Sequence, residues 1–262
     1  MEVVICDDNE RVGRTAATLI AEVVSRRGPA SVLGVATGSS PLTTYAALAD
    51  LVTTGRLDLS RAHAFALDEY VGLGAGHPQS YHSVIRRHVI EPLRMDPGRV
   101  HVPDGTASDL DQACLEYEHA IADAGGVDIQ ILGVGTNGHI GFNEPSSSLA
   151  SRTRVKTLTQ RTREDNRRFF DSLDDVPTHC LTQGLGTIMD ARAVVLVATG
   201  AHKADAVAAV VEGPVTARRP GSVLQFHPNA TIVVDEEAAS RLELADYYRH
   251  VWAVKPRQTV AP

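Results

Sequence analysis

The organisation of this chain is clearest in VDIQILGVGTNGHIGFNEP, residues 127–145. The first six residues, 127–132, are mainly apolar and predict a short buried strand. A glycine-dense turn follows directly and carries His139 and Glu144. Glycines let the backbone adopt positive φ and approach a ligand closely. A buried strand that ends in such a turn is typical of open α/β sheets, which place their functional residues at the carboxyl ends of the strands.

The same alternation of strand and helix extends in both directions along the chain. Strands are expected at residues 3–5, 31–36, 63–67, 127–132, 193–198 and 230–234. Helices are expected from a cap at Asp8 to about Arg27, from Pro41 onward, and over 110–124 and 202–212. Short apolar strands that alternate with helices predict an α/β, Rossmann-like fold: an open, mostly parallel sheet with helices on both faces.

One domain over residues 1–262 is expected, because no linker, internal repeat or low-complexity stretch divides the chain. Polar and apolar residues alternate over 153–158, which predicts an edge strand or hairpin arm. A small lid or arm around residues 151–180 is therefore part of the prediction.

Composition excludes several functional classes. The 262 residues are 43% hydrophobic, enough for a large core. The net charge of −7, with 25 basic and 32 acidic residues, argues against nucleic acid or an anionic membrane as a partner. Three widely spaced cysteines argue against a disulfide framework or a structural zinc site. With no signal-peptide pattern and no apolar run of about 18 residues, a cytoplasmic location is expected.

A second candidate segment is the end of the strand at residues 31–36. Thr37-Gly38-Ser39-Ser40 lies between this strand and the helix opened by Pro41. Backbone N–H groups at a helix N-terminus bind anions, and the three hydroxyls add donors, so the segment predicts a phosphate site. The alternative is that Ser40 is simply the helix N-cap.

A third segment, LDEYVG, residues 67–72, closes another strand with two adjacent carboxylates. A buried Asp68 at the sheet edge could act as a general base. Neighbouring residues on a strand point to opposite faces, so Asp68 and Glu69 are not expected to act as a pair. The alternative is that one of them caps the next turn.

Parallel strands bring these three segments to one edge of the sheet. Together they would supply a phosphate cradle, a carboxylate and the imidazole of His139, an inventory that suits proton transfer on a sugar phosphate. Lys203, after the strand at 193–198, could add a positive charge at the phosphate. The alternatives are a solvated helix lysine and a histidine that is merely structural.

The combination of LDEY, HPQSY and GHIGFNEP followed by SRTR resembles the glucosamine-6-phosphate deaminase family. Further matching stretches are GVATGSSPLTTY, RRFF, LTQGLGTIMDAR and ATGAHKADAVAAVVEGPVT, and the resemblance covers most of residues 31–240. It implies the conversion of glucosamine 6-phosphate and water to fructose 6-phosphate and ammonia in amino-sugar catabolism. It implies no metal and no organic cofactor.

The resemblance also implies roles for individual residues. His139 would handle the proton that opens the pyranose ring, and Glu144 would support the imidazole. Asp68 would remove the C2 proton. Some relatives have aspartate where this chain has Asn137. An amide cannot raise the basicity of His139 by charge, but it can hydrogen-bond and fix the ring tautomer.

The phosphate site implied by the resemblance adds two cations to the loop at residues 37–40. The matching positions are Gly38, Ser39, Ser40, Arg168 and Lys203. The planar guanidinium of Arg168 would grip the phosphate at two points.

Regulation is the last implication of the resemblance. Hexameric relatives bind N-acetylglucosamine 6-phosphate between subunits as an allosteric activator. The matching positions here include Ser147, Arg154, Lys156 and Thr157. The resemblance thus leaves two interpretations open: a homo-oligomer that binds this activator, or a solvated, charged strand with no regulatory role.

Two alternatives to the deaminase stay open. One is a 6-phosphogluconolactonase or another sugar-phosphate enzyme on the same fold, which would release no ammonia. The other is a sugar-phosphate sensor that binds without turnover. The intact set of Asp68, His139 and Glu144 argues against a sensor, as does the lack of a flanking helix-turn-helix pattern.

Overall fold

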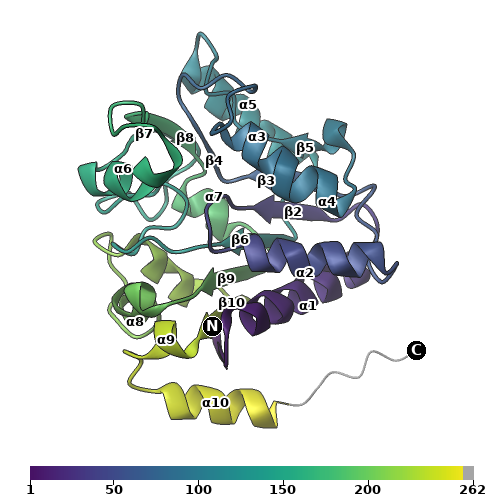
Figure 1. Ribbon diagram of the computed structural model, residues 1–262, viewed down its shortest axis with the longest axis vertical. Helices are drawn as coiled ribbons and strands as arrows, with labels where there is room; N and C mark the ends of the chain where they lie inside the picture. The colour runs from purple at the N-terminus through teal and green to yellow at the C-terminus, as the bar shows by residue number, and fades with distance from the viewer. Residues whose placement is uncertain (256–262) are drawn as a thin grey trace.

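The computed structural model describes residues 1–255, and it contains two sheets (Figure 1). The larger has seven strands in the order β1-β10-β9-β6-β2-β3-β5, and its paired strands are parallel. Their bounds are β1 Glu2–Cys6, β2 Val32–Val35, β3 His63–Ala66, β5 Val100–His101, β6 Ile129–Leu132, β9 Val194–Ala198 and β10 Ala230–Asp235. The open, mostly parallel sheet predicted from the sequence is confirmed.

Helices cover both faces of this sheet, as predicted. The helical segments are α1 Asn9–Arg27, α2 Leu42–Thr53, α3 Tyr81–Ile85, the π-helix η1 Arg86–Ile90, α4 Glu91–Leu93, η2 Pro97–Arg99, α5 Leu110–Asp123, α6 Gln160–Asn166, η3 Arg167–Phe169, α7 Leu185–Met189, η4 Ala201–Lys203, α8 Ala204–Val211, η5 Pro220–Phe226, α9 Glu236–Ala239 and α10 Ala245–Val254. The carboxylate of Asp8 accepts a hydrogen bond from the backbone N–H of Arg11, so Asp8 is the N-cap of α1.

The core consists of two apolar layers, one on each face of the large sheet. Successive strand residues alternate between them: Val3 and Ile232 pack with α5, α7, α8 and α9, whereas Val4 and Val233 pack with α1, α2 and the segment α3–η1–α4. This alternation follows from the two-residue period of a strand. Strands buried on both faces explain why the strand segments read as continuous apolar runs.

The strand order reverses direction between β2 and β6. From β2 the chain continues outward through β3 to β5, whereas from β6 it continues the other way through β9 to β10. The loops that leave the carboxyl ends of β2 and β6 therefore diverge and leave a crevice between them, where open α/β sheets bind their ligands. These two loops are residues 36–41 and 133–139.

A second, antiparallel sheet was not predicted as a unit. It consists of β4 Asp68–Tyr70, β8 His179–Thr182 and β7 Arg154–Thr157 in the order β4-β8-β7. The run predicted as one strand over 63–67 is followed at once by β4, so the chain passes from the large sheet into the small one beside Leu67. The predicted edge strand over 153–158 is confirmed as β7.

Residues 151–180 contribute β7, α6, η3 and the start of β8 to this part of the molecule (Figure 1). Whether they move as a lid stays a prediction, as does the single domain, whose residues 256–262 lie outside the described part. No helix within residues 1–255 combines the length and the apolar character needed to cross a bilayer.

Candidate active site

The loop after β2 leads into α2 through Thr37, Gly38, Ser39 and Ser40. Gly38 has φ of +86°, a conformation that favours glycine. The N-cap of α2 is Pro41 rather than Ser40, so the alternative that Ser40 is the cap is wrong. Ser39 Oγ accepts a hydrogen bond of 3.3 Å from Nη2 of Arg168, which brings this guanidinium to the loop.

Asp68 is the first residue of β4 and is 4% exposed. Burial, with a further contribution from the negative charge of Glu69, raises the pKa of the Asp68 carboxyl well above its usual range. No donor within residues 1–255 hydrogen-bonds to this carboxylate, and none therefore contributes to its pKa. A buried carboxylate that lacks donors is a stronger base than a solvated one.

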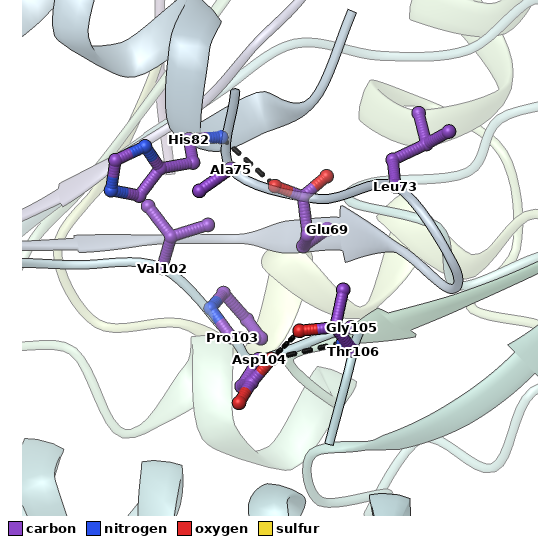
Figure 2. Close-up of a pocket in the computed structure, with 9 residues that line it drawn as sticks. All are labelled: Glu69, Leu73, Ala75, His82, Val102, Pro103, Asp104, Gly105 and Thr106. Atoms are coloured by element: carbon purple, nitrogen blue, oxygen red, sulfur yellow. Dashed lines mark hydrogen bonds between the residues drawn. The ribbon is translucent and has the colours of Figure 1, made fainter. Parts of the chain in front are cut away.

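Glu69 points away from Asp68, as the strand geometry predicted. Its carboxylate accepts hydrogen bonds from the backbone N–H groups of Tyr70, Tyr81 and His82, at 2.8, 2.8 and 2.9 Å. Glu69 therefore binds the N-terminus of α3, which agrees with the capping alternative for this residue. It lines a separate cavity of about 220 Å³ (Figure 2), so the two adjacent carboxylates open into different spaces.

The loop after β6 is shaped by glycines that place His139. A β-carbon on Gly135 would lie 2.3 Å from Cε1 of His139, so the imidazole packs where only glycine leaves room. Gly138 has φ of +85° and Gly141 has φ of +54°. The backbone N–H of Gly135 donates to the carbonyl of His139 at 2.9 Å, which closes the turn.

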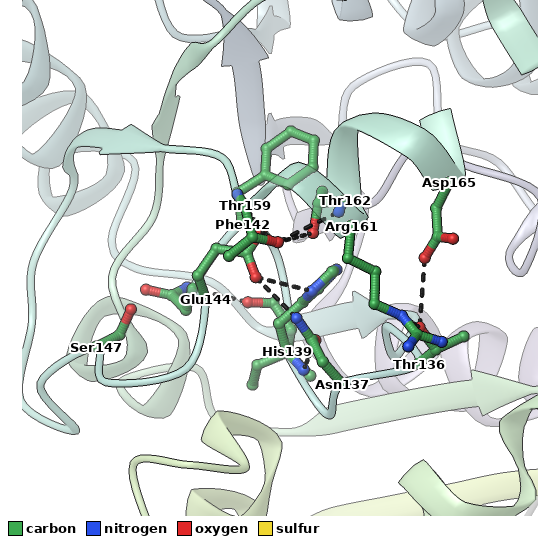
Figure 3. Close-up of polar contacts among 12 residues, drawn as sticks. Thr136, Asn137, His139, Phe142, Glu144, Ser147, Thr159, Arg161, Thr162 and Asp165 are labelled. Atoms are coloured by element: carbon green, nitrogen blue, oxygen red, sulfur yellow. Dashed lines mark hydrogen bonds and ion pairs between the residues drawn. The ribbon is translucent and has the colours of Figure 1, made fainter. Parts of the chain in front are cut away.

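Glu144 is the centre of the polar contacts around His139 (Figure 3). Its Oε2 lies 3.6 Å from Nδ1 of His139, and its Oε1 accepts bonds of 3.2 Å from both the N–H and the hydroxyl of Thr159. Burial by itself would raise the pKa of Glu144, but the contacts with His139, Thr162 and Thr159 outweigh burial and lower it to about 2. Glu144 is thus an anion throughout the physiological pH range.

Asn137 contacts Glu144 rather than the imidazole ring. Its Nδ2 donates to Oε2 of Glu144 at 2.8 Å, and its Oδ1 accepts from the backbone N–H of His139 at 3.1 Å. Asn137 makes no bond to the imidazole ring among the described contacts, so the expectation that it fixes the ring tautomer stays a prediction. The amide acts on the ring indirectly, because it orients the carboxylate that faces Nδ1.

Eight of the predicted catalytic and phosphate-binding residues line one cavity of about 230 Å³. Asp68 and His139 both line it, together with the predicted phosphate residues Thr37, Gly38, Ser39, Ser40, Arg168 and Lys203. Asn137 and Glu144 do not line the cavity, but both contact His139. The cavity lies at the crevice between β2 and β6, where the strand order reverses.

Two cations lie at the phosphate end of this cavity. Lys203, in η4, donates from Nζ to the backbone carbonyl of Val134 at 2.8 Å. Burial lowers the pKa of Lys203, the carboxylate of Asp165 opposes that change, and the positive charge of Arg168 adds to it. An anion between the two cations would neutralise their mutual repulsion.

We expect Lys203→Ala to weaken binding of a phosphorylated amino sugar by about 10- to 100-fold, because a charge-assisted hydrogen bond contributes about 1.5–3 kcal/mol. Steady-state kinetics with glucosamine 6-phosphate measure this change as a rise in KM. Lys255→Ala, which removes an exposed lysine paired with Glu2, is the control. Unchanged affinity in Lys203→Ala would exclude phosphate contact by this side chain.

Several residues that the sequence analysis did not select also line the cavity or hold its walls. Those that line it are Tyr81, Thr136, Thr162, Asp165, Asn166 and His202. Thr159, which caps α6, binds Glu144, and Nη1 of Arg219 donates to the carbonyl of Asn137 at 3.0 Å. The threonine cap of α6 was readable in the sequence; its contact with Glu144 was not.

The predicted allosteric residues lie outside the cavity. Arg154 donates to Oδ1 of Asn143 at 2.9 Å and to Oγ of Ser147 at 3.1 Å, and Ser147 is buried. Lys156 and Thr157 follow on β7, the edge strand of the small sheet. No group of three or more His, Cys, Asp or Glu in the described part of the chain is arranged to hold a metal ion.

Sequence comparisons agree with this arrangement. The profile of the family described as glucosamine-6-phosphate isomerases/6-phosphogluconolactonase matches residues 8–233. The chain is 61% identical to the glucosamine-6-phosphate deaminase of Cutibacterium acnes over 95% of each protein. It is 62% identical to that of Pseudarthrobacter chlorophenolicus over 98% of each.

Solved structures give the same result for the fold. A monomeric glucosamine-6-phosphate deaminase superposes with a TM-score of 0.89 at 40% identity, over 92% of this chain and 100% of the other. The 6-phosphogluconolactonase of Trypanosoma cruzi superposes with a TM-score of 0.73 at 19% identity, over 92% of this chain and 97% of the other. The second likeness concerns the fold alone.

Proposed function

The chain belongs to the family of glucosamine-6-phosphate isomerases and 6-phosphogluconolactonases, and on that premise we propose how the cavity lined by Asp68 and His139 carries out the deaminase reaction. The enzyme converts glucosamine 6-phosphate and water to fructose 6-phosphate and ammonia. The observation that carries the proposal is that a buried carboxylate, an imidazole and the predicted phosphate loop line one cavity.

Ring opening is the first step, and we assign it to His139. The imidazole takes the proton of the O1 hydroxyl and delivers a proton to the ring oxygen, so the C1–O5 bond breaks and C1 becomes an aldehyde. Nδ1 faces Glu144, which leaves Nε2 for the substrate. The permanent negative charge of Glu144 stabilises the imidazolium that forms during the transfer.

Isomerisation is the second step, and we assign it to Asp68. The carboxylate removes the proton from C2, the C1 carbonyl oxygen is protonated, and an enolamine forms. Return of a proton to C1 gives an imine at C2, which water hydrolyses to the ketone with release of ammonia. The raised pKa of Asp68 supports this role because a stronger base abstracts a carbon-bound proton more readily.

The phosphate end fixes the sugar for both steps. Hydroxyls and backbone N–H groups of residues 37–40, with Arg168 and Lys203, would hold the phosphoryl group at the start of α2. Anchoring one end of a flexible open-chain sugar keeps C2 near the base, and orientation of this kind contributes several kcal/mol to the barrier reduction, on the order of 7–11 in favourable cases.

A coupled assay for ammonia with glucosamine 6-phosphate tests the function. Turnover with stoichiometric ammonia and fructose 6-phosphate is expected. Hydrolysis of 6-phosphogluconolactone without ammonia release would instead favour the lactonase branch of the family. Binding of the amino sugar phosphate without any turnover would favour the sensor alternative.

We further propose that the enzyme is cytoplasmic and that N-acetylglucosamine 6-phosphate activates a homo-oligomer through Ser147, Arg154, Lys156 and Thr157. The contact of Arg154 with Asn143, the neighbour of Glu144, supports a connection to the active site. Sedimentation and kinetics, each with and without the N-acetylated sugar phosphate, test the proposal. A monomer with unchanged kinetics would contradict it.

A further inference from the structure

Thr182 stands beside Asp68 on the small sheet. The two residues are directly opposite in the antiparallel register of β4 and β8. Residues opposite each other in an antiparallel pair project from the same face. Thr182 is fully buried and Asp68 is 4% exposed. Both side chains therefore lie on the buried face of the small sheet.

The hydroxyl of Thr182 also contacts the segment that carries His139 and Glu144. Its Oγ1 accepts a hydrogen bond of 3.1 Å from the backbone N–H of Phe142, which lies between these two residues. A β-carbon on Gly141 would lie 3.1 Å from this oxygen and 3.6 Å from Oδ2 of Asp68. Gly141 has a positive φ and no side chain, so the loop can pack closely against Thr182 and Asp68.

The next residue, Gln183, also connects the segment before Asp68 with the segment before Glu144. Its backbone N–H donates to the carbonyl of Leu67 at 2.7 Å, and its Nε2 donates to the carbonyl of Ala66 at 3.0 Å. Its own carbonyl accepts from Nδ2 of Asn143 at 2.8 Å. Thr182 and Gln183, at the carboxyl end of β8, thus bond to both segments. Gln183 binds the backbone before Asp68, and the segment before Glu144 is bound through the backbone N–H of Phe142 and the side chain of Asn143.

We propose that Thr182 is a positioning residue that sets the separation between the carboxylate of Asp68 and the imidazole of His139. The two groups belong to different sheets and different loops, and neither holds the other directly among the described contacts. Thr182 acts through Phe142 N–H on one side and through its register with Asp68 on the other. This inference rests on the proposed roles of Asp68 and His139.

A matched pair of variants separates the hydroxyl from the shape of the side chain. Thr182→Val keeps the branched shape and loses the acceptor, whereas Thr182→Ser keeps the acceptor and loses a methyl group. A misplacement of about 1 Å can lower turnover by up to about 100-fold, so we expect Thr182→Val to lower kcat by about 10- to 100-fold. KM for glucosamine 6-phosphate should change by less than about threefold, because the phosphate loop is untouched.

The rate of C2 proton exchange in deuterated water is the decisive readout. We expect it to fall together with kcat in Thr182→Val and to stay near the parent value in Thr182→Ser. Thr187→Val is the control, since it removes another buried threonine hydroxyl, one that binds Glu118 away from the cavity. Should Thr182→Val fail to fold, Thr182→Cys, with a weak thiol acceptor, replaces it and should show an intermediate loss.

Parent-like kcat and C2 exchange in Thr182→Val would overturn the proposal. Equal losses in Thr182→Ser and Thr182→Val would also overturn it, because packing rather than the hydroxyl would then be responsible. Failure of the underlying mechanism looks different: Asp68→Asn would keep its turnover, or the parent enzyme would release no ammonia.

Discussion

Asp68→Asn is expected to lower kcat for glucosamine 6-phosphate by about 10²–10⁴-fold, the usual contribution of a general base. The asparagine amide has the same shape but cannot accept the C2 proton. Binding of the substrate should change little, because the phosphate-binding groups stay in place. Exchange of the C2 proton with deuterated solvent, followed by NMR, measures the loss at the step itself.

Asp68→Asn is also expected to be more stable than the parent once the pH rises above the acidic range. The pKa of Asp68 is raised in the folded state, so the folded protein holds this proton more tightly than the unfolded chain. The stability of the parent therefore falls as pH rises from the ordinary aspartate pKa, about 3.9, through the raised value. Asparagine has no such loss, so the Tm difference between variant and parent should grow over this range and then level off.

Asp50→Asn is the control for both measurements, since Asp50 is exposed and its carboxylate makes no hydrogen bond or ion pair within residues 1–255. Parent-like C2 exchange in Asp68→Asn would remove this residue from the base role. A Tm difference between the variant and the parent that does not vary with pH would contradict the pKa argument without affecting the catalytic one.

His139→Gln is expected to lower kcat by about 10²-fold or more, because the ring-opening step loses its proton carrier. Glutamine can still hydrogen-bond within the cavity, but it does not take up a proton near neutral pH. Ring opening should then limit the whole reaction, so a substrate deuterated at C2 should react at the same rate as the undeuterated one.

The isotope comparison distinguishes His139 from Asp68. A variant that slows C2 abstraction should express the C2 isotope effect more strongly, whereas His139→Gln should suppress it. Full activity of His139→Gln on the cyclic substrate would refute the assignment. A large isotope effect in this variant would place His139 at the isomerisation step instead.

The sequence predicted those parts of the fold that local patterns encode. Asp8 caps α1 as expected, and the run at 127–132 forms β6 with its glycine-rich turn at the sheet edge. The prediction that Asp68 and Glu69 point apart is also confirmed. These features depend on residues close together in the chain, so the period of the apolar residues and the turn chemistry were sufficient.

The small sheet could not be predicted from such local patterns. β4 has only three residues and pairs with β8, more than 100 residues later, so no local period marks it as a separate strand. The bond from Phe142 to Thr182 likewise depends on how distant segments meet. The contact of Asn137 with Glu144 lies within one loop, but no residue pattern there marks which group the amide binds. Thr182 was not selected from the sequence, although it lies in the matching stretch LTQGLGTIMDAR, because a threonine in a strand is ordinary.

The sequence alone determined the parallel sheet, its covering helices and the kinds of groups at the strand ends, because burial and turn geometry constrain residue types locally. The tertiary structure decided which groups share a cavity. The loops after β2, β6 and β9 meet because these strands are neighbours in the sheet, and Asp68 joins them because the chain leaves the large sheet beside it. Strand order and register arise from long-range packing, which no local stretch of sequence encodes.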